Sequence, residues 1–159
     1  MQSSISNAYS VTVDVPSSAE AIHSEPVARH GGFIEHRAFR ILLIDDNRDA
    51  IDSMGALLEL MDYDIRTAED AESGLAIAAS FQPHLVLSDI GLPGMDGYAL
   101  APHLREAAGE RKLILAAVTS YGRARDKARA REAGFDYHLV KPVDADALLE
   151  FVARQFREY

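Results

Sequence analysis

The sequence of 159 residues contains no cysteine. It therefore has no disulfide framework, no thiolate zinc site and no cysteine nucleophile, and this composition favours a cytoplasmic location. It also lacks an apolar run approaching the roughly 18–20 residues that a bilayer-spanning helix needs. Its first residues lack the basic and then apolar pattern of a signal peptide. We therefore expect a soluble protein that has no membrane partner.

Positive charge is scarce as well, with 16 Lys and Arg against 25 Asp and Glu and a formal charge of -9. A chain of this charge is repelled by a phosphate backbone, which argues against nucleic acid as a partner. Hydrophobic residues make up 48% and charged residues 26%, as in an ordinary globular domain with a buried core. The composition excludes a wholly disordered chain, a collagen and a coiled coil.

The pattern of the sequence changes near residue 39. Residues 1–39 are rich in serine and hold two of the six prolines and three of the six histidines, without sustained periodicity. We expect them to form a mobile extension that precedes a single domain over residues 40–159. Residues 10–15 alternate like a strand before Pro16, so a short docking strand is the alternative for that segment.

Beyond Arg40, short apolar runs alternate with segments of helical spacing. The apolar runs predict strands over residues 41–44, 63–67, 85–87, 113–118 and 137–140. A helical segment follows each strand, starting near residues 47, 70, 96, 123 and 144. This alternation predicts parallel strands joined by right-handed crossovers, with helices on both faces of the sheet.

Three details refine the predicted helices. The first and last helices should each bury one stripe, made of Ile51, Met54, Leu58 and Met61 in the first and of Leu148, Val152 and Phe156 in the last. Asp46 or Asn47 can cap the first helix. Pro102 lies too far into the third helix to be a first-turn proline, so we expect a kink or a shifted helix start there.

Four of the five predicted strands end in residues that can carry out phosphate or metal chemistry. They are Asp45 with Asp46, Asp89, Thr119 with Ser120, and Lys141. The carboxyl ends of parallel strands lie along one edge of a sheet, beside the crevice where ligands bind, so these side chains should share a pocket. Helix caps or turns would explain a single Asp, Thr or Ser at such a position, but not a lysine directed at carboxylates.

Three carboxylates in one crevice repel each other, and a hard divalent cation lowers that cost. Oxygen ligands without cysteine or a histidine cluster favour Mg²⁺. A carboxylate, a hydroxyl and an ammonium beside Mg²⁺ are the groups that phosphoryl transfer uses. The carboxylate attacks, the metal and the lysine neutralise developing charge, and the hydroxyl donates to a phosphoryl oxygen.

Four short motifs occur in order: IDD at residues 44–46, LVLSDIGLPGMDGY at 85–98, VTS at 118–120 and VKP at 140–142. With these motifs, residues 40–157 resemble the response-regulator receiver domain of two-component signalling. The resemblance implies an α/β flavodoxin-like (βα)5 fold, a doubly wound parallel sheet with strand order 2-1-3-4-5. It also implies a cis peptide bond between Lys141 and Pro142.

The resemblance implies a role for each acidic residue of the pocket. Asp89 would be the phosphoacceptor. Mg²⁺ would be bound directly by Asp46, by Asp89 and by the backbone carbonyl of Gly91. Asp45 would act mainly through a metal-bound water.

The resemblance also implies the residues that contact the phosphoryl group and respond to it. Thr119 with the adjacent Ser120 and Lys141 would make the phosphoryl contacts. His138 occupies the switch position, three residues before the lysine, where the family usually has Tyr or Phe. It would rotate between exposed and buried states and add pH sensitivity, and the alternative is a partly exposed loop histidine. Tyr137 should point to the opposite face of the strand.

The implied function is a single-domain response regulator that is no enzyme beyond slow self-dephosphorylation. It would receive its phosphoryl group from a histidine kinase or histidine phosphotransfer protein and signal by phosphorylation-dependent binding to a further protein. A phosphate sink or shuttle in a phosphorelay is the alternative. A Mg²⁺-dependent aspartyl-phosphate phosphatase fits less well, because it needs a second acid two residues after the nucleophile, where this chain has Gly91.

A basic segment stands out in the second half of the chain. It contains Arg123, Arg125, Lys127, Arg129 and Arg131. It is either a solvated helix face or a surface for a partner.

Overall fold

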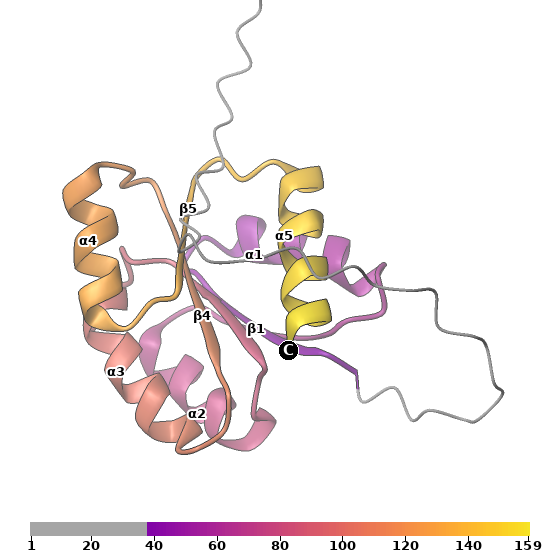
Figure 1. The fold of residues 1–159 in the computed structure, drawn as a ribbon, viewed down its shortest axis with the longest axis horizontal. Coiled ribbons are helices and arrows are strands. Elements are labelled where there is room, and N and C mark those ends of the chain that lie inside the picture. The colour runs from indigo at the N-terminus through magenta and orange to yellow at the C-terminus, as the bar shows by residue number, and fades with distance from the viewer. Residues whose placement is uncertain (1–37) are drawn as a thin grey trace, which may run out of the picture.

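A computed structural model describes residues 38–159, which form a parallel five-stranded sheet with helices on both faces (Figure 1). The strands are β1 (Arg40–Ile44), β2 (Asp64–Ala68), β3 (Leu85–Ser88), β4 (Ile114–Thr119) and β5 (Tyr137–Val140). The helices are α1 (Arg48–Glu59), α2 (Ala71–Phe81), α3 (Gly97–Ala108), α4 (Ala124–Ala133) and α5 (Ala145–Glu158). The strand order β2-β1-β3-β4-β5 confirms the predicted doubly wound flavodoxin-like fold.

The expected extension lies outside the described residues, except for Ala38 and Phe39. The strand-like segment at residues 10–15 also lies outside them. Within residues 38–159, no helix has both the length and the hydropathy needed to cross a bilayer.

Four of the five helices begin at a side-chain cap, as their sequences indicate. The capping residues, each accepting the backbone N–H three positions later, are Asn47 (3.2 Å), Asp70 (2.7 Å), Asp96 (2.9 Å) and Asp144 (3.0 Å). Each cap satisfies one of the N–H groups that a helix leaves without an internal partner. Of the two cap candidates for α1, the structure therefore selects Asn47 over Asp46.

The sheet separates two apolar cores, and its central strands are buried on both faces. Helices α2, α3 and α4 cover one face, and α1 and α5 cover the other (Figure 1). Along β1, Leu42 and Ile44 belong to the first core, whereas Ile41 and Leu43 belong to the second. This burial explains why the strand reads as a continuous apolar run rather than as an alternating one.

Three local expectations for the helices differ from the structure. Met61 is 53% exposed, because α1 ends at Glu59 and the chain then turns through Asp62, whose φ is 63°. Phe156 is 46% exposed, since it lies near the end of α5 and covers only the rim of the core. Pro102 lies inside α3, which starts at Gly97 directly after its cap Asp96, so the shifted helix start is wrong.

An aromatic cluster closes the second core at the amino ends of the strands. Phe39 is 4% exposed, and its ring stacks on His84 with centroids 5.1 Å apart. The edge contacts of Phe39 reach Tyr63 at 6.1 Å and Tyr159 at 5.6 Å. Phe39 therefore packs against the residues of the predicted domain.

Replacing Phe39 with alanine should lower the free energy of unfolding by about 3 kcal/mol, because it leaves a cavity among rings that cannot close around it. Chemical denaturation monitored by circular dichroism measures this change. Tyr121→Ala is the control, since that ring is 57% exposed and its loss should have little effect. Equal destabilisation by the two substitutions would show that Phe39 is not part of the core.

Candidate functional site

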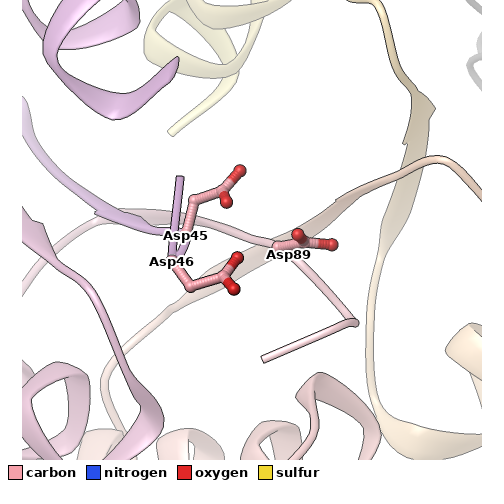
Figure 2. A group of neighbouring side chains, drawn as sticks. All are labelled: Asp45, Asp46 and Asp89. Carbon is pink, nitrogen blue, oxygen red and sulfur yellow. The ribbon is translucent and has the colours of Figure 1, made fainter. Parts of the chain in front are cut away.

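Three carboxylates meet at the carboxyl edge of the sheet. Asp45 and Asp46 follow β1 and Asp89 follows β3, and Figure 2 shows their side chains directed into one space. One carboxylate oxygen from each lies within 4.8 Å of the other two. The two strands are adjacent, and the backbone N–H of Asp89 donates to the carbonyl of Ile44 at 2.8 Å. Neighbouring strand ends therefore produce the acidic cluster.

Lys141 joins two of these carboxylates. Its Nζ lies 2.6 Å from Oδ2 of Asp45 and 3.0 Å from Oδ2 of Asp89. Burial disfavours the charge on Lys141, but its hydrogen bonds to Asp45 and Asp89 outweigh burial and raise the pKa of the ammonium above its ordinary value. The lysine is therefore a fixed positive charge at this edge of the sheet.

The backbone of Lys141 is tied to the neighbouring strand β4. Its N–H donates to the carbonyl of Thr119, at the end of β4, at 2.9 Å. The peptide bond that joins it to Pro142 is cis, as the resemblance implied. A lysine that follows the edge strand β5 thus reaches the ends of β1 and β3.

The cluster has more negative than positive charge. Three carboxylates face one ammonium, and Asp46 forms no ion pair within residues 38–159. Every side-chain donor in the cluster is a carboxylate oxygen, which is the ligand that hard cations such as Mg²⁺ prefer. The residues therefore fit a magnesium site.

The backbone around Asp89 depends on a glycine that the sequence alone did not single out. A Cβ atom on Gly97, the first residue of α3, would lie 2.5 Å from the carbonyl oxygen of Asp89 and 2.7 Å from Cα of Ile90. Any side chain at this position would push α3 away from the backbone of Asp89 and Ile90. The Asp-Gly pair at the start of a predicted helix is the signal that could have marked Gly97.

Shorter-range contacts fix the Asp89 side chain and its loop. The N–H of Gly91 donates to Oδ1 of Asp89 at 3.1 Å, and Oγ of Ser88 donates to the carbonyl of Asp89 at 3.0 Å. Both carboxylate oxygens of Asp89 are therefore oriented, one by Gly91 and one by Lys141.

Thr119 and Ser120 lie at the end of β4, beside the cluster. Thr119 is 1% exposed, and its hydroxyl accepts the N–H of Tyr121 at 3.3 Å. Ser120 is exposed and borders two clefts that open on either side of the site. No hydrogen bond among the described residues joins either hydroxyl to Asp89.

His138 is buried in β5 beneath α4, apart from the acidic cluster. It is 3% exposed, it is paired in register with Ala117, and neither ring nitrogen has a hydrogen-bond partner within residues 38–159. Lys127 and Arg131 of α4 line the small cavity beside it. Burial, and next the charge of Lys127, lower the pKa of the imidazole.

The expectation of a partly exposed loop histidine is therefore wrong, because position 138 points into the core from a strand rather than from a loop. Tyr137 points to the opposite face, as predicted, where its ring packs against Phe151 at 5.2 Å.

An apolar cleft of about 660 Å³ opens next to Asp45 and Lys141. Its walls come from α1 and from the start of α5, with Met54, Leu57 and Val143 among the lining residues. The acidic cluster thus lies at the end of an apolar surface.

Comparisons with known proteins agree with this architecture. The family model for the response regulator receiver domain matches residues 41–153. The transcriptional regulator RpaA of Synechocystis is 33% identical over 118 residues, which cover 74% of this chain and 49% of RpaA. Protein PilH of Pseudomonas aeruginosa is 31% identical over 113 residues, 71% of this chain and 93% of PilH.

The same likeness extends to solved structures. The CheY-like receiver domain protein of Methanospirillum hungatei JF-1 has a TM-score of 0.69 and 30% identity, covering 77% of this chain and 99% of that one. The chain spans about half the length of RpaA and nearly all of PilH.

The buried imidazole of His138 should make stability depend on pH. The unfolded chain binds a proton at this residue near the ordinary pKa of about 6.5, whereas the native chain binds it only at lower pH. The stability that the neutral ring contributes is thus present above about pH 6.5 and is lost as the pH falls toward the native pKa.

Denaturation at a series of pH values should show a steeper loss of stability below pH 6.5 or so in the wild type than in His138→Leu. His103→Gln, which removes an exposed histidine from α3, should keep the wild-type profile. Identical profiles for the wild type and His138→Leu would contradict the buried neutral state.

Proposed function

This chain belongs to the response regulator receiver domain family of two-component signalling, and we propose that it accepts a phosphoryl group on Asp89 from a phosphohistidine protein. The observation that carries the proposal is the position of Lys141, whose ammonium contacts both Asp45 and Asp89. An ammonium at this place neutralises charge that develops when the carboxylate of Asp89 attacks phosphorus.

The choice of Asp89 over its two neighbours rests on access and charge. Asp45 has its side chain 8% exposed, and it accepts a short hydrogen bond from Lys141 and another from the N–H of Asn47. Asp46 is exposed but has no contact with Lys141. Asp89 accepts from the same ammonium and from one backbone N–H, as Asp45 does, but its side chain is the more exposed of the two at 13%. It also stands at the position that the resemblance to the family gives to the phosphoacceptor.

In the proposed transfer, a carboxylate oxygen of Asp89 forms a bond to phosphorus as the bond between phosphorus and the donor's imidazole nitrogen breaks. The electron pair of that bond stays on the imidazole of the donor. Lys141 then pairs with the phosphoryl oxygens instead of with the free carboxylate. Thr119 and Ser120, which follow one another at the end of β4, are the proposed hydroxyl contacts of the phosphoryl group.

The proposal includes Mg²⁺ as the cofactor. Asp46, Asp89 and the backbone carbonyl of Gly91 would bind it directly, and Asp45 would act through a bound water. When bound, the cation offsets the repulsion among the carboxylates and the incoming phosphoryl oxygens.

Phosphorylation would act as a signal rather than as a step of enzymatic turnover. We propose that the acyl phosphate hydrolyses slowly without a second protein. We also propose that His138 and the neighbouring helix α4 change conformation when Asp89 is phosphorylated. Gly91 supplies no second acid near the acceptor, which supports a phosphoacceptor over a phosphatase. A phosphate sink or shuttle uses the same chemistry and differs only in the protein that receives the phosphoryl group next. A cytoplasmic location is part of the same proposal.

The apolar cleft supports a protein donor in addition to small phosphorylated compounds. It lies between α1 and the start of α5 and ends at Asp45 and Lys141. A helix that packs its apolar side against Met54 and Leu57 would carry a phosphohistidine to the acceptor. We therefore propose this cleft as the docking site of the histidine kinase or histidine phosphotransfer protein.

Intact-protein mass spectrometry after incubation with acetyl phosphate and Mg²⁺ tests the acceptor. We expect the wild type to gain one phosphoryl group, and we expect chelation of Mg²⁺ to abolish the gain. Asp89→Asn should gain none, because an amide nitrogen and carbonyl cannot attack phosphorus as a carboxylate does. A gain that survives in Asp89→Asn would place the acceptor elsewhere.

The cleft is tested by transfer from a phosphorylated histidine phosphotransfer protein that labels the wild type. Leu57→Asp should slow this transfer by about tenfold or more. Docking of the donor would have to remove the new carboxylate from water at the centre of an apolar contact, which costs free energy. Leu60→Asp is the matched control, because Leu60 lies beyond α1 and is 80% exposed. Labelling of both variants by acetyl phosphate shows that they fold, and equal transfer to both would contradict the docking site.

A further inference from the structure

Positive charge in this acidic chain is concentrated in one helix. Of 16 Lys and Arg residues, five fall within residues 123–131, where Asp126 is the only acidic residue. These residues form the start and body of α4, in which Ala130 is the only buried residue. Most of α4 therefore lies outside the core, and its surface is basic.

A cleft of about 760 Å³ lies between α4 and the start of α3, and we refer to it as the α3–α4 cleft. Arg123, Arg125 and Arg129 line its basic side, and Asp96 and Tyr98 line the other. Figure 1 shows the two helices next to each other on the same face of the sheet. The cleft is thus a second concave surface, on the far side of Ser120 from the apolar cleft.

Two arginines of the α3–α4 cleft form no ion pair within the described part of the chain, although Asp96 and Asp126 also line the cleft. Neither Arg125 nor Arg129 forms an ion pair there. Asp126 accepts the backbone N–H of Arg123 at 3.2 Å and so caps the helix. Arg125 and Arg129 are one helical turn apart, where like charges repel each other. An anionic group between them would remove this repulsion.

The cleft also offers aromatic surface. The guanidinium of Arg129 lies 4.1 Å from the centroid of the Tyr98 ring, which holds both side chains in place. Tyr121, at the mouth of the cleft, is 57% exposed. Tyrosine and arginine together are enriched at the centres of protein–protein interfaces.

We propose that the α3–α4 cleft binds an acidic segment of a partner protein, with carboxylates on Arg125 and Arg129 and apolar side chains on the tyrosines. A peptide can place its charges at separate points along the cleft. A nucleic acid carries a continuous row of phosphates, which would meet Asp96 and Asp126 within the cleft and the acidic cluster beyond Gly91. The mixed lining therefore favours a peptide.

This inference goes beyond the proposed function, because the binding residues Arg125 and Arg129 have no part in phosphoryl transfer, although Gly91 and Ser120 of the proposed phosphoryl site border the cleft. It names a chemical class for a further partner and does not require phosphorylation. The test accordingly uses the full-length, unphosphorylated chain, so that its failure says nothing about the phosphoacceptor.

Fluorescence anisotropy of a short labelled peptide of alternating glutamate and leucine measures the binding. We expect the wild type to bind the peptide and added NaCl to weaken the binding. The double variant Arg125→Glu, Arg129→Glu should bind about tenfold more weakly or worse, because each reversal replaces an attraction with a repulsion. The matched control, Arg111→Glu with Arg157→Glu, changes the net charge equally at exposed sites outside the cleft and should bind like the wild type.

Arg129 contacts Tyr98, so the single variant Arg125→Glu provides the test if the double variant does not fold. It leaves that contact in place and should still weaken binding. Three results would overturn the proposal: no binding of the peptide to the wild type, equal binding by the cleft and control variants, or tighter binding of a thymidine oligonucleotide of equal charge. The last result would make the cleft a nucleic-acid site.

Discussion

The contact of Lys141 with Asp45 and Asp89 is the interaction on which the rest of the site depends. It joins the ends of three strands, and in the sheet β5 is separated from β1 by β3 and β4. Without this ammonium, three carboxylates whose oxygens lie within 4.8 Å of one another would have no positive charge between them. Their mutual repulsion would then cost free energy. The hydrogen bond from the backbone N–H of Lys141 to the carbonyl of Thr119 ties the lysine to the end of β4.

The fold places this contact through burial of the strands. Residues 41–44 and 85–88 are buried on both faces of the sheet, so charged side chains can appear only where those strands end. Because all five strands are parallel, their polar ends fall along one edge. The two apolar cores and the charged site are consequences of the same pattern, and so are the two clefts that flank Ser120.

Much of this arrangement could be predicted from the sequence, because apolar runs, caps and strand-end polar residues are local signals. The strand order is not local, and it came from the resemblance carried by the motifs around Asp89 and Lys141. His138 is buried because α4 packs over it, and Phe39 is buried because an aromatic cluster surrounds it. Neither kind of tertiary contact is visible in the local sequence. The exposure of Met61 follows from where α1 ends, which periodicity locates only to within a few residues.

We propose that Asp89, and neither of its acidic neighbours, takes the phosphoryl group, and one measurement distinguishes the three residues. Reduction of the phosphorylated chain with sodium borohydride converts an acyl-phosphate aspartate into homoserine, and peptide mass spectrometry then locates it. We expect homoserine at position 89 alone, beside unchanged Asp45 and Asp46. Homoserine at position 45 or 46, or none in a chain that has gained a phosphoryl group, would contradict it.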